Sequence, residues 1–126
     1  MEKKTPRVLI IEDELPLFSA LESKLGKEGF EVLSAKNGKT GLETALREHP
    51  DVILLDIVMP VMDGMTMLTK LREDAWGKEA QVIVLTNLSD NEMIKQSFEK
   101  GIHDYLIKSD WRLDDVMAKI RQKLGI

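Results

Sequence analysis

Residues 51–64, which read DVILLDIVMPVMDG, decide the fold of this chain. The run opens with a block of aliphatic residues and then reaches a carboxylate, Asp56. A short apolar block bounded by charge indicates a parallel strand buried on both faces. In open parallel sheets the ligand crevice lies at the carboxyl ends of the strands, so we expect Asp56 to serve chemistry rather than packing. Pro60 then disfavours helix, and Asp63 and Gly64 turn the chain into one.

The same pattern recurs along the chain. Short apolar runs rich in β-branched residues alternate with segments whose apolar residues recur at helical spacing. Five strands alternating with five helices predict a doubly wound α/β fold, a parallel sheet covered by helices on both faces. We expect strands at 7–11, 30–35, 52–55, 81–85 and 104–107, and helices with apolar faces within 17–25, 42–46, 67–71, 93–98 and 113–124.

Proline and glycine mark the predicted ends of several segments. Pro16 falls in the first turn of the first helix, where its missing N–H costs little. We expect Gly26 and Gly29 to close that helix. The pair Asn37-Gly38 is expected to form a turn.

Length and composition limit the function classes. The 126 residues fit one domain over 1–126, with 1–6 as a frayed tail. The chain has no cysteine and no amino-terminal apolar segment, which argues against disulfides and secretion and favours the cytoplasm. No apolar run approaches the roughly 18 residues of a membrane helix. The net charge of -4 disfavours direct nucleic-acid binding, because phosphate backbones are bound by clustered Lys and Arg.

Polar side chains stand at the carboxyl ends of the predicted strands. Because these ends meet at one edge of a parallel sheet, we expect the side chains to converge. Gathered carboxylates repel one another unless a cation lies among them. Carboxylates, a backbone carbonyl and waters form the oxygen-rich set that Mg²⁺ prefers, and Mn²⁺ is not distinguished from it. The residues expected at this edge are Glu12, Asp13, Asp56, Thr86 and Lys108.

A metal, a lysine and a hydroxyl around a central carboxylate form a site for phosphoryl transfer. Asp56 is the expected nucleophile, because it lies on the middle strand between the acids and the Thr86–Lys108 side. Asp13, which has an acidic neighbour, is better suited to holding metal.

The chain resembles the receiver domain of two-component response regulators over nearly its whole length. The resemblance rests on Glu12-Asp13, on segment 56–64, on Thr86 and on segment 101–108, GIHDYLIK, all in the family's order and spacing. It implies a flavodoxin-like (βα)5 fold with strand order 2-1-3-4-5, an order that the residues alone do not supply.

The resemblance also implies a role for each acid. A sensor histidine kinase or a phosphotransfer protein would pass a phosphoryl group to Asp56. Mg²⁺ would be held by Asp13, by Asp56 and by the main-chain carbonyl of Val58. Glu12 would act through water. The chain would be a switch rather than an enzyme, since it would catalyse only its own phosphorylation and dephosphorylation.

The switch itself would involve three further residues. Lys108 would pair with the phosphoryl group, Thr86 would swing its hydroxyl toward it, and Tyr105 would turn inward as Thr86 vacates space. The added charge of about -1.5 to -2 would bias two loop arrangements. A downstream protein would read the face formed by the fourth expected helix, the strand ending at Ile107 and the helix at 113–124. That face is also a candidate homodimer contact.

Some positions depart from the family's usual pattern. Ser109 stands where a proline usually follows the lysine through a cis bond, and we expect a trans bond because a non-proline cis bond costs about 2.5–4 kcal/mol. Asn87 stands where a small residue is usual. Val58 and Leu88 fill positions that influence dephosphorylation. Neither apolar side chain can orient an attacking water, so we expect a long-lived phosphorylated state.

Three other functions would suit a fold of this class. A phosphatase with an aspartyl nucleophile would want a second acid two residues later, where this chain has Val58. A flavin-binding module would place a phosphate-binding loop after the first strand, where residues 12–14 are all acidic and would repel a phosphate. The alternative that stays open is a receiver-like scaffold that binds partners without being phosphorylated.

Overall fold

The computed structural model describes residues 5–57, 61–86, 95, 99, 105–107 and 112–126. Strands and helices alternate along these residues. The strands are β1 (Arg7–Ile11), β2 (Glu31–Ala35), β3 (Val52–Asp56), β4 (Val82–Thr86) and β5 (Tyr105–Ile107). The helices are α1 (Leu15–Lys27), α2 (Gly38–Glu48), α3 (Gly64–Glu73), the short 3-10 helix η1 (Gly77–Glu79) and α5 (Leu113–Leu124).

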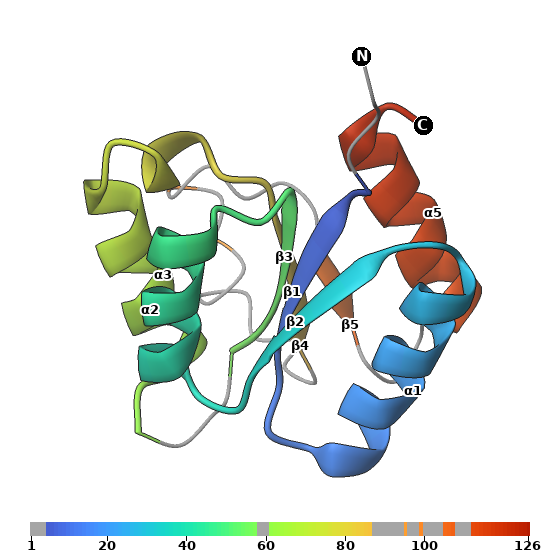
Figure 1. Cartoon of the computed structure of the whole chain (residues 1–126). Helices are drawn as coiled ribbons and strands as arrows, with labels where there is room; N and C mark the ends of the chain where they lie inside the picture. Colours follow the sequence, from blue (N-terminus) through green and yellow to red (C-terminus); the bar gives the residue numbers. More distant parts are fainter. Residues whose placement is uncertain (1–4, 58–60, 87–94, 96–98, 100–104, 108–111) are drawn as a thin grey trace.

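The five strands form one parallel sheet in the order β2-β1-β3-β4-β5. Helices α1 and α5 cover one face of the sheet, and α2 and α3 cover the other (Figure 1). The predicted doubly wound α/β fold and the strand order 2-1-3-4-5 are therefore confirmed. Of the helix expected around 93–98, the structure describes only Lys95, which is helical, and the other residues fall outside the described part of the chain.

The strands of the sheet bury alternate residues on opposite faces. In β1, Leu9 and Ile11 join the apolar cluster under α2 and α3, whereas Val8 and Ile10 join the cluster under α1 and α5. All five residues of β3 are buried. Since successive side chains of a strand point to opposite faces, only an unbroken apolar run can fill both clusters. This is why the block before Asp56 carries no polar alternation.

Side-chain caps start two of the helices on one face. Asn37 Oδ1 accepts a hydrogen bond from the N–H of Thr40 at 2.8 Å, and Asp63 Oδ1 accepts one from the N–H of Thr66 at 2.8 Å. The prediction of a turn at Asn37-Gly38 is wrong, because Asn37 is the N-cap of α2 and Gly38 is its first residue. Asn followed by Gly is common both in turns and at the start of helices, so the local pattern was ambiguous.

The ends of α1 and α2 are marked by unusual backbone angles. Gly26 lies inside α1 and does not end it. Gly29 follows with a φ of +89°, which glycine adopts without steric conflict, and the chain then enters β2. Helix α2 ends at Glu48, and its C-cap residue His49 is left-handed with φ 48° and ψ 60°. Pro50 disfavours helical angles at the residue before it, which helps to stop the helix there.

The link from α3 to β4 contains η1, which the sequence pattern did not predict. Arg72 Nη1 donates hydrogen bonds to the carbonyl oxygens of Gly77 at 2.6 Å and Ala80 at 2.9 Å. Asp74 Oδ2 accepts hydrogen bonds from the backbone N–H groups of Trp76 and Gly77. Burial lowers the pKa of Arg72, although Glu79 opposes this. These bonds hold the link against the end of α3.

Candidate functional site

The register of β1 and β3 brings two acids together at the carboxyl edge of the sheet. Ile11 lies opposite Leu55, so the next residues along the two strands are Glu12 and Asp56. The N–H of Glu12 donates a hydrogen bond to the carbonyl oxygen of Ala35 at 3.0 Å, which extends the pairing of β1 with β2 by one residue. Both acids are therefore held by strand backbone rather than by loops.

Carboxylate oxygens of Glu12, Asp13 and Asp56 lie within 4.8 Å of one another. Glu12 is 1% exposed and Asp56 is 3% exposed, whereas Asp13 is exposed. Glu12 Oε2 accepts a hydrogen bond from the N–H of Glu14 at 3.2 Å. The cluster thus has a buried floor of two acids and a third acid at the surface. All three were expected from the sequence to lie at this edge.

The donor set fits a hard divalent cation. Burying carboxylates is costly, and the cost rises when like charges are close together. A divalent cation offsets both effects, and carboxylate oxygens are the ligands that Mg²⁺ prefers in proteins. Glu12, Asp13 and Asp56 offer carboxylate oxygen atoms for such an ion.

The strands on the other side of Asp56 position two further candidates. Asp56 lies opposite Leu85, so Thr86 follows one residue further along β4. Tyr105 lies opposite Val84 on β5, is partly buried, and packs against the apolar cluster under α2 and α3. Their predicted switching roles stay predictions.

The remaining predicted site residues lie outside the described part of the chain. Val58 follows β3, and Lys108 follows β5. The same holds for Asn87, Leu88 and Ser109, so the predictions made for these residues, including the trans bond before Ser109, are untested.

Sequence reasoning did not assign Gly64 to the site, although its backbone touches the residue that bears the carboxylate. The N–H of Gly64 donates a hydrogen bond to the carbonyl oxygen of Ile57 at 2.8 Å. A Cβ at position 64 would overlap the carbonyl oxygen of Asp56 and would lie 2.8 Å from the Cα of Ile57. Glycine is therefore required where α3 starts against the end of β3. The pair Asp63-Gly64 is the signal for this contact in the sequence, but by itself it predicts only a turn into a helix.

The architecture and the acidic cluster can be compared with known proteins. The chain matches the family model described as the response regulator receiver domain over residues 8–121. The chain belongs to the response regulator receiver family. The response regulator PleD of Caulobacter vibrioides is 39% identical to it over 117 residues, which is 91% of this chain and 25% of PleD. The transcriptional regulatory protein PrrA of Mycobacterium bovis is 37% identical over 120 residues, which is 95% of this chain and 50% of PrrA.

A solved receiver domain has nearly the same backbone. The CheY-like response regulator receiver domain protein from Methanospirillum hungatei JF-1 superposes with a TM-score of 0.89 at 27% identity, covering 97% of this chain and 95% of that one. This receiver chain spans half or less of the length of the two curated relatives described above. In the part of the receiver that the structure describes, no helix has both the length and the apolar character needed to cross a membrane.

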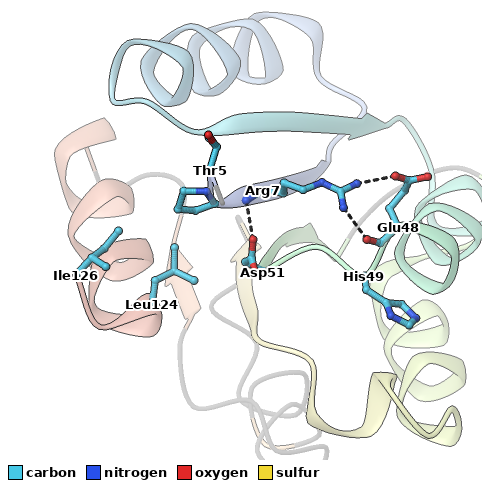
Figure 2. Close-up of a pocket in the computed structure, with 8 residues that line it drawn as sticks. Thr5, Arg7, Glu48, His49, Asp51, Leu124 and Ile126 are labelled. Carbon is cyan, nitrogen blue, oxygen red and sulfur yellow. Dashed lines mark hydrogen bonds and ion pairs between the residues drawn. The ribbon is translucent and has the colours of Figure 1, made fainter. Parts of the chain in front are cut away.

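A hollow of about 390 Å³ lies at the opposite, amino-terminal edge of the receiver sheet. Figure 2 shows Arg7 reaching across it toward the end of α2. Its guanidinium donates to Glu48 Oε1 at 2.6 Å and to the Glu48 carbonyl oxygen at 2.9 Å, and its N–H donates to Asp51 Oδ2 at 2.8 Å. Hydrogen bonds from Arg47 and Arg7 lower the pKa of the Glu48 carboxyl. Arg7 therefore ties β1 to α2 and to the start of β3, away from the acidic cluster.

Proposed function

We propose that this receiver domain, residues 1–126, accepts a phosphoryl group on Asp56 from a sensor histidine kinase or a histidine phosphotransfer protein. The observation that carries the proposal is the three-acid cluster at the carboxyl edge, in which Asp56 lies 3% exposed at the end of the central strand. A carboxylate oxygen of Asp56 would attack the phosphorus of a phosphohistidine. The P–N bond breaks, the histidine nitrogen keeps the electron pair, and the product is an aspartyl phosphate.

The acids around Asp56 would hold Mg²⁺, and Mn²⁺ has the same preference for oxygen ligands. The proposed ligands are Asp13, Asp56 and the main-chain carbonyl of Val58, with Glu12 acting through water. When bound, the ion supplies positive charge that offsets the repulsion between the carboxylates and the incoming phosphoryl group. The burial of Glu12 and Asp56 supports the proposal, since it limits the access of water that would hydrolyse the product.

The readout would follow from the charge added to Asp56. Lys108 would pair with the phosphoryl group, and Thr86 would turn its hydroxyl toward it. Tyr105, which is partly buried on the edge strand β5, would move inward as Thr86 moves. A downstream protein would then bind the face that contains β5 and α5, and two copies of the domain could meet there. The domain would act on no other substrate, because its only reaction is its own phosphorylation and dephosphorylation.

The proposal is tested by intact-protein mass spectrometry after incubation with acetyl phosphate, with Mg²⁺ and with a chelator. The parent should gain the mass of one phosphoryl group only with Mg²⁺, and the adduct should be removed by hydroxylamine, which cleaves acyl phosphates. Asp56→Ala and Asp56→Asn should gain nothing. Asp51→Asn is the control, because Asp51 lies at the opposite edge and contacts the N–H of Arg7.

The outcomes separate the two functions that the chain could have. Phosphorylation that depends on both Mg²⁺ and Asp56 is expected. If the parent gains no adduct from acetyl phosphate or from phosphorylated kinase domains, the proposal fails. The scaffold that binds partners without phosphorylation would then be the better account.

A further inference from the structure

The loop between β3 and α3 connects Asp56 to Asp63, the N-cap of α3. Residues 61–64, the described end of this loop and the start of α3, lie against the backbone of Asp56, because a Cβ at Gly64 would overlap the Asp56 carbonyl oxygen. Their position therefore bears on how Asp56 presents its carboxylate to an ion. The inference below rests on the proposed function and concerns what holds this loop in place.

Two backbone hydrogen bonds fix the described ends of the loop. At its start, the carbonyl oxygen of Ile57 accepts the N–H of Gly64 at 2.8 Å. Near its end, the carbonyl oxygen of Met62 accepts the N–H of Gly38 at 2.9 Å. The first bond comes from the loop's own helix, whereas the second comes from Gly38, the first residue of α2. The loop is thus held from outside by a different helix.

The contact between α2 and the loop leaves no space for a side chain at position 38. A Cβ there would overlap the carbonyl oxygen of Met62 and would lie 2.9 Å from the Met62 carbonyl carbon and 3.1 Å from the carbonyl oxygen of Asp63. All three are backbone atoms of the loop, so they cannot rotate away as the end of a flexible side chain can. Any residue other than glycine at position 38 must displace the loop or α2.

The loop also holds a conformation that its sequence disfavours. Val61 has a φ of +69°, although it is β-branched, and the residue is 78% exposed. A β-branched residue avoids this region, and its own exposed side chain has little packing with which to hold it there. Such strain persists only where surrounding contacts over-determine the backbone. The hydrogen bond from Gly38 to the neighbouring Met62 is such a contact.

We propose that Gly38 is a positioning residue for the phosphorylation site. Through its N–H and its missing side chain, it lets the start of α2 pack against the backbone of Met62 and Asp63. In this way it holds residues 61–64 against the backbone of Asp56, one of the proposed Mg²⁺ ligands. Gly38 touches neither the ion nor the phosphoryl group. It acts through the backbone of Met62.

The test is Gly38→Ala, with Gly77→Ala as the matched control. A Cβ at Gly77 would likewise overlap a backbone carbonyl oxygen, that of Leu71, but it lies in η1 after the end of α3, on the side of the fold away from the acids. Both variants should lower the thermal midpoint. Mg²⁺ alone is titrated by calorimetry, and acetyl phosphate is used for phosphorylation rates. Gly38→Ala should weaken Mg²⁺ binding by about tenfold or more, as expected when an outer contact of a metal site is lost, and Gly77→Ala should leave it unchanged.

A measurement on the parent covers the case in which Gly38→Ala does not fold. If the contact favours Mg²⁺ binding, then Mg²⁺ binding must favour the contact, because coupling free energies are reciprocal. Amide hydrogen exchange at Gly38 should therefore slow when Mg²⁺ is added, while exchange at Ala80, whose N–H donates to Gly77 in the link after α3, should not.

Two results would count against the inference in different ways. If the parent binds Mg²⁺ but Gly38→Ala binds it equally well, the positioning role is wrong and the proposed function stands. The same holds if the rate of amide exchange at Gly38 does not change when Mg²⁺ is added. If the parent binds no Mg²⁺, both the proposed function and the positioning role are overturned.

Discussion

Replacing Asp56 with asparagine should stabilise the metal-free domain. Asp56 and Glu12 are both buried, and their carboxylate oxygens lie no more than 4.8 Å apart. Two unit charges at 4.8 Å repel by about 3.5 kcal/mol at an effective dielectric constant of about 20. Asp13 is exposed, so its contribution is screened by solvent and is left out of this sum. Asparagine keeps the shape of the side chain and removes the charge.

The expected gain in stability is smaller than the full repulsion, because an amide interacts with neighbouring donors less favourably than a carboxylate does. We expect the free energy of unfolding of Asp56→Asn to exceed that of the parent by about 2 kcal/mol in a chelator at neutral pH. Mg²⁺ should reverse the order, since a ligand that binds only the folded state stabilises it by about 2.7 kcal/mol at 100 times its dissociation constant. Asp56→Asn lacks a proposed ligand, so Mg²⁺ should raise its free energy of unfolding by less.

The assay is equilibrium unfolding in urea, followed by circular dichroism, for both proteins with chelator and with Mg²⁺. Asp51→Asn is the control, because it removes a charge that is not part of the cluster. In the chelator, the free energy of unfolding of Asp51→Asn should not exceed that of the parent. If Asp56→Asn were no more stable than the parent without metal, the close carboxylates would not be repelling one another. If Mg²⁺ stabilised both proteins equally, the ion would not bind at Asp56.

Three further measurements test other parts of the structure. Val61→Asn should raise the free energy of unfolding by about 1 kcal/mol, because a left-handed residue costs about 1–2 kcal/mol and asparagine tolerates this region; a lower thermal midpoint would contradict the assigned conformation. Hydrogen bonds from Arg47 and Arg7 hold the pKa of Glu48 below its ordinary value of 4.5, so its carboxylate should stabilise the fold above that pH and lose this effect as the pH falls through the lowered pKa. In urea, the free energy of unfolding of Glu48→Gln should therefore differ from that of the parent at neutral pH, and the difference should be smaller in strong acid. An equal difference at both pH values would rule this out. Once formed, the phosphorylated state should last well beyond seconds in Mg²⁺ buffer, because Val58 cannot orient an attacking water; the mass adduct followed over time measures this, and its loss within seconds would refute it.

The sequence alone was enough to predict the layered fold, because the signals involved are local. An apolar block without alternation must be a strand covered on both faces, and residues 52–55 are indeed fully buried. Alternation of such blocks with helical spacing leaves few arrangements other than a doubly wound sheet. The acids Glu12 and Asp56 were predictable for the same reason, since each stands directly after an apolar block of the sequence. The strand order, by contrast, came from the family resemblance.

Local patterns could not settle features that depend on packing between distant segments. Asn37-Gly38 has the same local signal as a turn and as a helix start, and only the packing of α2 on the sheet decides between them. Glu12 and Asp13 are adjacent acids, yet one is buried and the other exposed. Glu12 still pairs with Ala35 of β2 through its N–H, and Asp13 follows beyond this pairing, in the loop before α1. Even the need for glycine at position 38, in α2, comes from the carbonyl of Met62, which lies on the loop between β3 and α3. The sequence determined which elements form and what chemistry stands at their ends, and tertiary packing decided which backbone atoms meet there.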